Sequence, residues 1–345
     1  MDLQTKNKKT PKVSVVMSNY NGHTLKLIDN SLSSILKNNY KNLEVIVIDN
    51  ASTDDSVSFI KKKYGKNKRL KLIENKINMY SLGLNLGIKN ANGKYIAFFN
   101  NDATVDNGYF QTFISFLEKN KHIGLAQGKL LAANNHALID CVGETMDIFG
   151  NPTSIGHGEK ALGNFTTQTD ILSVSGSCSM LRKSIVDDIG YFDEDFGIGY
   201  EDMDLSLRAR KFGYDIVYFP NIYVYHKRGA TDLADIVRIK VRWHFNKNRI
   251  MTIIKNYPLH LIITTLPVVV LIYSLAGFWE IMFQNKISLG LTRFTSMFWV
   301  LTHLSIILQK RKQIEQIPTK NNWSTIYQLM YKTQMLQKAK ESLHI

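Results

Sequence analysis

The chain has 345 residues, enough for one large domain with an appendage or for two domains. Its two cysteines, Cys141 and Cys178, exclude a disulfide framework and have no metal-ligand spacing, so a reduced, cytoplasmic environment fits. The net charge of +14 is unevenly distributed, because residues 226–345 hold 17 Lys/Arg and 5 Asp/Glu, a net of +12. The same residues include the most apolar runs, so we expect an anionic membrane surface as partner and no nucleic acid.

Strands and helices alternate over the first hundred residues, after a polar, basic tail at 1–11 in which we find no secretory signal. Apolar runs and helical spacing predict strands at 13–17, 43–48, 70–73 and 94–99, with helices between them, including 24–37 and 82–89. This alternation predicts a mainly parallel sheet with helices on both faces.

The pattern loosens after residue 103. We expect a helix at 107–119 and then irregular loops and short strands between Leu131 and Asp170. Further on, the sequence predicts a strand at 171–174, a helix at 203–212 closed by Gly213, and short strands at 216–219 and 222–225 around Pro220.

The last third of the chain predicts long helices. A basic amphipathic helix is expected at 232–255, along a membrane interface. Leu259–Trp279 has no charged residue and is long enough to cross a bilayer, with a kink expected at Pro267. A second apolar stretch, 287–308, precedes the basic residues 310–312, so the positive-inside rule assigns both outer ends to the cytoplasm. The alternative is a buried helical hairpin of a soluble domain.

Acidic residues follow the predicted strands. Asp49 comes directly after 43–48, Asp102 lies just past 94–99, and Glu201-Asp202 precedes the helix at 203–212. Open α/β sheets bind ligands outside the carboxyl ends of their strands, which is where we expect Asp49 and Asp102. The order of these acids suggests a sugar-nucleotide transferase, with one acid for the nucleobase, one for a metal and one for proton abstraction.

Two segments, Val13–Asn21 and Val47–Asp54, resemble the first signature of family 2 glycosyltransferases, which have the GT-A fold. The resemblance implies that Asp49 bonds the nucleobase and that Ser18 and Tyr20 line the nucleotide pocket. A carboxylate suits this role because it accepts the imide N–H of uracil or thymine. The alternative is that Asp49 only caps the next helix.

The segment Glu74–Gly87 resembles the family's Asn/Gly-rich donor segment. Small residues let a helix start approach a diphosphate, and amide side chains can bond ribose or phosphate, which makes Asn78 and Asn85 candidate donor ligands. Asparagine and glycine are common in loops of this Asn-rich chain, so an ordinary loop is the alternative.

Asn100-Asn101-Asp102 occupies the place of the family's Asp-x-Asp motif. The resemblance implies that Asp102 binds a divalent metal, Mg²⁺ or Mn²⁺, which neutralises the donor diphosphate. Asn100 replaces the first Asp, as in the rhamnosyltransferase-like branch that the chain most resembles, and this departure puts strict metal dependence in question. His226 matches a histidine near the metal in many relatives. A strand-ending turn and a structural histidine are the alternatives.

The segment Gly190–Arg208 resembles the family's Phe-Asp-Glu … Glu-Asp-x-Asp-Leu … Arg signature closely. Asp202 stands where the family has its general base, which must reach the acceptor hydroxyl within about 3 Å. Helix-start acids favoured by the dipole are the alternative, and this reading accounts for Asp204. Ser175–Cys178 lies where the family has an acceptor-side loop. Ile239–Trp243 is similar to a Gln-x-x-Arg-Trp motif of processive synthases but lacks the Gln.

We therefore predict an inverting, metal-dependent glycosyltransferase that moves a sugar from a nucleotide-diphosphate donor to a lipid-linked or nascent glycan acceptor at the cytoplasmic face of the membrane. The expected units are a tail at 1–11, a GT-A catalytic domain at 12–230, an interface helix at 231–256, a hydrophobic hairpin at 257–309 and a basic tail at 310–345. A processive polysaccharide synthase, a nucleotidyltransferase and a non-enzymatic membrane or nucleic-acid-binding protein are the alternatives.

Overall fold

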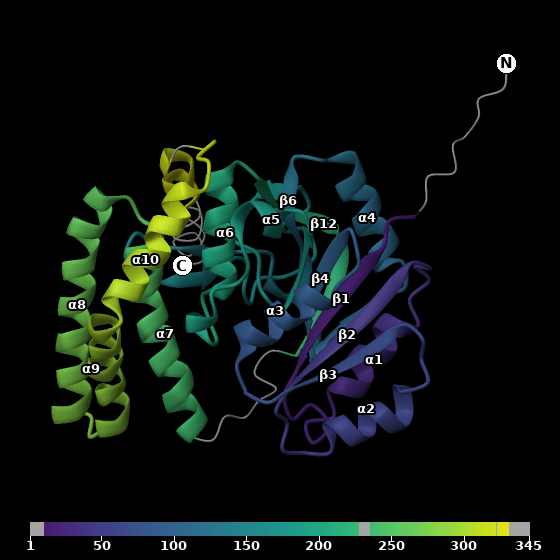
Figure 1. The fold of residues 1–345 in the computed structure, drawn as a ribbon, viewed down its shortest axis with the longest axis horizontal. Coiled ribbons are helices and arrows are strands. Elements are labelled where there is room, and N and C mark those ends of the chain that lie inside the picture. Colours follow the sequence, from purple (N-terminus) through teal and green to yellow (C-terminus); the bar gives the residue numbers. More distant parts are fainter. Residues whose placement is uncertain (1–9, 228–234, 322, 331–345) are drawn as a thin grey trace.

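The computed structural model describes residues 10–227, 235–321 and 323–330. A ten-stranded mixed sheet forms its centre (Figure 1). Four parallel strands make one half, in the order β4 (Tyr95–Asn100), β1 (Val13–Asn19), β2 (Leu43–Asn50) and β3 (Leu70–Asn75). These strands confirm the four predicted from the apolar runs.

The other half of the sheet mixes directions. β11 (Cys178–Arg182) lies antiparallel between β4 and β6 (Ile123–Ala132), and β12 (Asp215–His226) runs parallel to β6. Shorter strands complete the structure: β5 (Ala103–Val105), β7 (Asn135–Cys141), β10 (Thr169–Asp170), and a separate hairpin of β8 (Glu144–Met146) and β9 (Pro152–Ser154). The expectation of a mainly parallel sheet therefore holds only for the first half of the fold.

Two expectations for single strands are wrong in detail. Residues 171–174 form no strand, apart from a bridge between Ser173 and Glu144, and the strand comes later, as β11. The two short strands expected around Pro220 are one strand, β12, whose register against β6 shifts between Tyr218 and Tyr223. Proline lacks an N–H for the ladder, which explains an irregularity there rather than a continuous pairing.

Helices cover both faces of the sheet because successive strand side chains point in opposite directions. Val15 packs with α1 (Ile28–Leu36), α2 (Ser56–Tyr64) and α4 (Tyr109–Lys119) in one core cluster. Its neighbour Val16 belongs to the opposite cluster. The helices on that side are α3 (Tyr80–Asn90), α5 (Ile185–Ile189) and α6 (Glu201–Phe212), and the 3-10 turn η1 (Glu194–Phe196) precedes α6.

Four helices follow the sheet: α7 (Asp235–Asn256), α8 (Leu259–Met282), α9 (Ile287–Thr302) and α10 (Leu304–Gln316). Figure 1 shows α8 and α9 side by side, with α7 between them and the rest of the domain. α8 continues past Pro267, and it is the one described helix long and apolar enough to cross a membrane. The expected second stretch is broken at His303, where α9 and α10 meet at 67°.

The placement of α7 corrects one prediction. We expected its basic side chains along a membrane interface, yet Lys247, Arg249 and Lys255 are buried. α7 contributes Ile250, Met251 and Ile254 to a third core cluster, together with residues of α6, α8 and α9. The second half of this helix is therefore part of the protein interior.

Candidate active site

Polar side chains occupy the carboxyl edge of the parallel strands. The register pairs Asn19 with Asp49 across β1 and β2, and Ser18 with Asn100 across β1 and β4. Each of these polar residues comes at the end of an apolar strand. Because parallel strands end at the same edge of a sheet, the polar side chains lie together there. The edge is a row of carboxylate, amide and hydroxyl groups, the chemistry that binds a polar ligand in an open α/β fold.

Asp49 lies within this row and is only 2% exposed. Its Oδ2 accepts hydrogen bonds from Asn19 Nδ2 at 2.7 Å and from the Ser52 hydroxyl at 2.6 Å, and its Oδ1 accepts from the Ser52 N–H at 2.9 Å. Asn19 Oδ1 in turn accepts from Asn101 Nδ2 at 2.8 Å. A hydrogen-bonded chain therefore links Asp49 to the turn that carries Asp102.

The other predicted donor residues lie in different environments. Ser18 is nearly buried and its hydroxyl accepts from Asn50 Nδ2 at 3.0 Å, whereas Tyr20 and Asn78 are exposed. Asn85 is buried, and its amide exchanges hydrogen bonds with the backbone of Phe192 at 2.9 and 3.0 Å. Asn85 therefore ties α3 to the segment before α6, and it does not join the row of polar groups at the sheet edge.

Asp102 and His226 meet where β12 ends. His226 Nε2 lies 3.3 Å from Asp102 Oδ1, and its Nδ1 lies 2.7 Å from Asp140 Oδ2. Asp102 Oδ1 is buried and has no hydrogen bond of good geometry among the described residues. A buried carboxylate oxygen of this kind needs a partner, and a hard divalent cation is one that fits.

Asp102 and His226 are two possible ligands, and the described residues hold no cluster of three or more His, Cys, Asp or Glu side chains that could bind a metal ion. Burial lowers the pKa of His226, but its contacts with Asp102 and Asp140 prevail and raise the pKa to about 9. A cation on Nε2 would require the neutral ring, with its remaining proton on Nδ1 and donated to Asp140. Carboxylates often hold a ligand histidine in this way. Asp140 was missed from the sequence because it lies in the region that we expected to be irregular.

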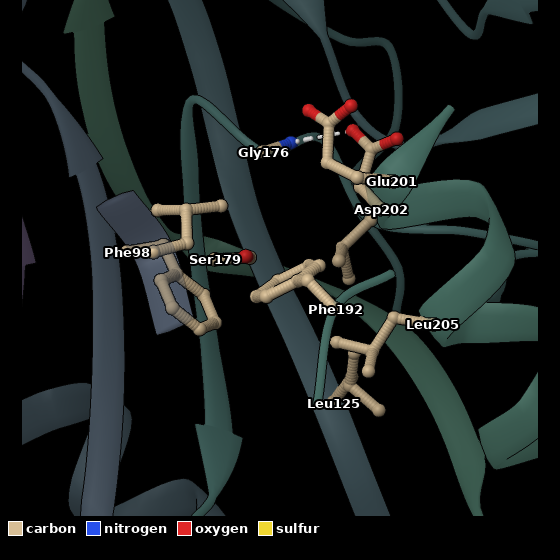
Figure 2. A pocket seen from close by; sticks show the side chains of 10 residues that line it. Phe98, Leu125, Gly176, Ser179, Phe192, Glu201, Asp202 and Leu205 are labelled. Atoms are coloured by element: carbon tan, nitrogen blue, oxygen red, sulfur yellow. Dashed lines mark hydrogen bonds between the residues drawn. The ribbon is translucent and has the colours of Figure 1, made fainter. Parts of the chain in front are cut away.

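Glu201 and Asp202 begin α6 and lie side by side above an apolar floor that includes Phe98 and Phe192 (Figure 2). Asp202 Oδ2 accepts from the Gly176 N–H at 2.8 Å, and Oδ1 accepts from the Met203 N–H at 2.8 Å. Burial raises the pKa of Asp202 despite these bonds. Burial and the neighbouring Asp202 raise the pKa of Glu201 well above its ordinary value. A carboxylate with a raised pKa is a stronger base.

Tyr80 connects the two acidic sites and was not predicted. Its hydroxyl donates to Asn100 Oδ1 at 2.9 Å and lies 3.3 Å from the Gly176 carbonyl oxygen. Burial raises its pKa well above 10, and Glu201, Asp202 and Asp102 raise it further. The sequence could have indicated this residue, because Tyr80 lies inside the Asn/Gly-rich donor segment Glu74–Gly87.

A cavity of about 300 Å³ opens beside Asp202, between the β8–β9 hairpin and α7. The ring of Phe245, on α7, is 40% exposed and forms part of its wall. This ring lies against Gly199, where a Cβ would approach it to 2.6 Å and where φ is +81°. Glycine at 199 therefore allows the aromatic ring to come close to the acidic pair.

The C-terminal helices hold the segment that leads into α6. Asn248 Nδ2 lies 2.7–2.9 Å from the carbonyl oxygens of Phe196, Ile198 and Gly199. Lys247 donates to the carbonyl oxygen of Asp195. Because Glu201 and Asp202 follow directly, α7 contributes to the position of the acidic pair.

Asp204 has a different role from the one expected. We expected the helix dipole to account for this acid, but its side chain is completely buried. Its carboxylate lies 2.9 Å from both Arg208 and Lys255, and Lys255 also contacts Asp193 at 2.6 Å. Lys310, on α10, pairs with Asp193 as well. We call these five residues the buried charge network. Despite burial, Lys255 and Arg208 hold the pKa of Asp204 well below its usual range.

Comparison with known proteins agrees with this geometry. The family model for glycosyl transferase family 2 matches residues 14–190. An uncharacterized glycosyltransferase of Haemophilus influenzae is 36% identical over 146 residues, 41% of this chain and 44% of the relative. The putative glycosyltransferase EpsE of Bacillus subtilis is 30% identical over 251 residues, 66% of this chain and 87% of the relative.

A poly-beta-1,6-N-acetyl-D-glucosamine synthase of Staphylococcus epidermidis is 25% identical over 232 residues, 67% of this chain and 53% of the relative. The chain thus spans about half the length of several curated relatives that it matches. The whole-protein activities of these relatives therefore do not transfer to it directly.

Two solved structures share the fold. GalNAc-T7, solved with UDP, GalNAc and Mn²⁺, has a TM-score of 0.60 at 13% identity, covering 87% of this chain and 58% of its own. The mannosyltransferase PcManGT of Pyrobaculum calidifontis, solved with GDP-Man and Mn²⁺, has a TM-score of 0.52 at 17% identity, covering 95% and 87%. The fold is GT-A, and the family model covers about half of the chain. The chain belongs to glycosyl transferase family 2.

Proposed function

We propose that this protein is an inverting glycosyltransferase that moves a sugar from a nucleotide-diphosphate donor to a hydroxyl of a lipid-linked or nascent glycan acceptor. The observation that carries the proposal is the position of Asp202, which is held by the Gly176 N–H beside a cavity of about 300 Å³. A single displacement requires a base for the acceptor hydroxyl and no enzyme nucleophile.

The donor would lie along the polar row at the sheet edge. A carboxylate has about four acceptor positions, and the bonds from Asn19 and Ser52 take three of those on Asp49. The remaining position on Oδ1 suits the imide N–H of a uracil or thymine base. Ser18 and Tyr20 would line the nucleotide pocket, and Asn78 would contact the donor. The contacts of Asn85 favour a supporting role instead.

Asp102 and His226 would hold a divalent metal, Mg²⁺ or Mn²⁺, with Asp140 fixing the histidine ring. When bound, such an ion supplies positive charge that neutralises the leaving diphosphate. Asp102 Oδ1 is buried and has no hydrogen bond of good geometry among the described residues, which supports this role. Asn100 in place of a first acid supports assignment to the rhamnosyltransferase-like branch. It also leaves two protein ligands, Asp102 and His226, so we expect moderate metal affinity.

The acceptor would enter the cavity beside Asp202. Its sugar would pack on the Phe245 ring, since sugar C–H faces pack well on exposed aromatic surfaces, and its hydroxyl would point to Asp202. The Asp202 carboxylate accepts the hydroxyl proton while the hydroxyl oxygen attacks the anomeric carbon, and the bond to the donor phosphate breaks on the opposite face. Tyr80 would orient Asn100 and the loop at Gly176.

We also propose that the enzyme acts at the cytoplasmic face of the membrane. The apolar, mostly exposed α8 and the net charge of +12 in residues 226–345 support membrane association. A catalytic domain held there would meet lipid-linked acceptors. We propose one change to the expected domain division: residues 246–255 join the catalytic domain instead of an interface helix, because they belong to the core that supports α6.

A processive polysaccharide synthase remains the second candidate, favoured by the similarity to the S. epidermidis synthase. A nucleotidyltransferase is the third. Purified full-length protein is incubated in detergent with Mn²⁺ and a panel of UDP-, dTDP- and GDP-sugars. We expect slow release of nucleoside diphosphate from one donor and inverted anomeric stereochemistry in the product. Release of pyrophosphate would instead indicate nucleotidyl transfer, and a long polymer would indicate processive synthesis. Retained stereochemistry would contradict the inverting mechanism.

A further inference from the structure

The outer surface of α8 and α9 is an exposed apolar face. The most exposed apolar residues recur at intervals of three, four, seven or eight along each helix. On α8 and α9 they are Leu259, Ile263, Leu271, Leu275, Phe278, Met282, Ile287, Leu291, Phe298 and Leu301. Leu275 is 62% exposed and Phe298 is 68% exposed. We call these ten residues the hairpin face. Val268, Val270, Ile272 and Trp279 are also exposed, so the apolar surface of α8 is broad.

The opposite side of the hairpin is fixed to the catalytic domain along its length. Tyr273 lies near the middle of α8. The Arg249 guanidinium stacks over its ring, with the guanidinium carbon 5.3 Å from the ring centroid. Arg249 Nε in turn donates to the carbonyl oxygen of Phe149 at 2.7 Å. Lys247 lies 4.6 Å from the Trp299 ring of α9 and donates to Asp195. The catalytic domain thus lies at the same level as the middle of α8 and the C-terminal end of α9.

This arrangement conflicts with a spanning α8. If α8 ran along the bilayer normal, Arg249, Lys247 and the loops around Phe149 and Asp195 would lie at mid-membrane depth. Polar loop backbone exposed to lipid there cannot satisfy its hydrogen bonds. Figure 1 shows α7, α8 and α9 side by side and level with the sheet domain, so a spanning orientation would immerse much of that domain.

The charges and aromatic groups around the hairpin face suit a membrane interface. Glu280, an acid at the turn end of α8, is neutralised by Arg242 and Arg293. Lys286 in the turn is exposed, and exposed Trp279 and Phe283 lie beside it. Aromatic rings and an exposed lysine next to an apolar face are common where a segment meets an anionic lipid surface.

We propose that the hairpin face docks in the plane of an anionic membrane and that α8 does not cross it, so the turn at 283–286 stays on the same side as the catalytic domain. This rests on the proposed membrane association. The hairpin face would contact the lipid interface, with α8 and α9 lying parallel to the membrane surface and the sheet domain above it.

Cysteine labelling of full-length protein in cells tests the orientation. Cys141 and Cys178 are buried, so a membrane-impermeant maleimide reports on introduced cysteines. Gln284→Cys marks the turn, and Lys66→Cys marks an exposed site on the catalytic domain. We expect both to be labelled in inverted vesicles and neither in intact spheroplasts. Labelling of Gln284→Cys only from the spheroplast surface would overturn the proposal in favour of a spanning hairpin.

Vesicle flotation tests the face itself. Leu275→Asp is expected to lower binding to vesicles of phosphatidylcholine and phosphatidylglycerol by roughly tenfold or more, since it brings a charge into the apolar contact. Gln111→Asp, on the far helix α4, has the same charge change and should bind as wild type. Equal binding of both variants, or wild-type protein that self-associates without binding vesicles, would overturn the proposal. Sugar-nucleotide hydrolysis, measured separately, would still test the proposed reaction.

Discussion

Acids of the candidate active site and those of the buried charge network differ in how their charges are satisfied. Asp102 Oδ1 and Glu201 Oε2 are buried without a hydrogen bond among the described residues. Asp193 and Asp204, a few residues away, are matched by Lys255, Arg208 and Lys310. Unsatisfied buried polar groups are costly and mark places where a ligand acts, whereas fully paired ones hold elements together.

The two neighbouring acids of α6 illustrate the contrast. Asp202 and Asp204 are two residues apart on one helix, so their side chains point in different directions. Burial raises the pKa of Asp202, which has only N–H donors as partners, and two cations lower the pKa of Asp204. The same residue type therefore has a raised pKa at position 202 and a lowered pKa at position 204. Variants of these two residues are expected to separate catalysis from stability.

The largest effect on rate is expected for Asp202→Asn. The amide keeps the size of the side chain and loses the ability to accept a proton, so turnover should fall by about 10²–10⁴-fold. Donor affinity and thermal stability should stay close to wild type. Single-turnover rates with saturating donor, together with calorimetric donor binding, measure this. Normal turnover in this variant would show that Asp202 is not the base.

The largest effect on stability is expected for Asp204→Asn. Removing this charge leaves Arg208 and Lys255 buried without their common partner, which costs about 3–5 kcal/mol of unfolding free energy. Urea unfolding measures the loss, with Asp202→Asn as the matched control in the same helix. An unchanged unfolding midpoint would show that the network contributes nothing to stability.

The same carboxylate predicts a pH dependence. The pKa of Asp204 is lower in the folded state than in the unfolded chain, where it is about 3.9. Its contribution is therefore complete above about pH 4 and is lost as pH falls through the folded pKa. The difference in unfolding free energy between wild type and Asp204→Asn should shrink in that acidic range. A difference that stays constant down to pH 2 would contradict the ion-pair account.

A smaller effect is expected for Asp102→Ala. If Asp102 holds the ion that bridges to the diphosphate, the variant should lose the joint stabilisation by Mn²⁺ and donor. For ligand at 100 times its Kd this stabilisation is about 2.7 kcal/mol. Thermal unfolding is compared with Mn²⁺, with donor and with both. Asp106→Ala, in the following turn, is the control, and an equal response in both variants would make Asp102 an ordinary turn residue.

The smallest effect is expected for Phe245→Ala. Removing the exposed ring should raise the acceptor KM by roughly tenfold, the worth of about 1–1.5 kcal/mol of aromatic contact, and leave donor hydrolysis unchanged. Tyr223→Ala, on β12 and outside this cavity, is the matched control for loss of an exposed aromatic ring. A fall in donor hydrolysis with no change in acceptor KM would place Phe245 outside the acceptor site.

The sequence by itself determined the parallel half of the fold and the order of its acids. Buried strands read as short apolar runs, and parallel strands end at one edge, so Asp49 and Asp102 could be assigned to that edge from their positions alone. Helical spacing likewise predicted α3, α4 and α6 to within a few residues.

Only the tertiary structure decided what surrounds each acid. Three features depend on contacts between residues 51 to 87 positions apart: the direction of β11, the contact between His226 and Asp140, and the closure of α7 over Asp204. No local pattern distinguishes a lysine that faces lipid from one that pairs with a buried acid, because both occur on helices with apolar neighbours. Lys255 was therefore predicted at a membrane surface and lies in the interior, where it holds Asp204.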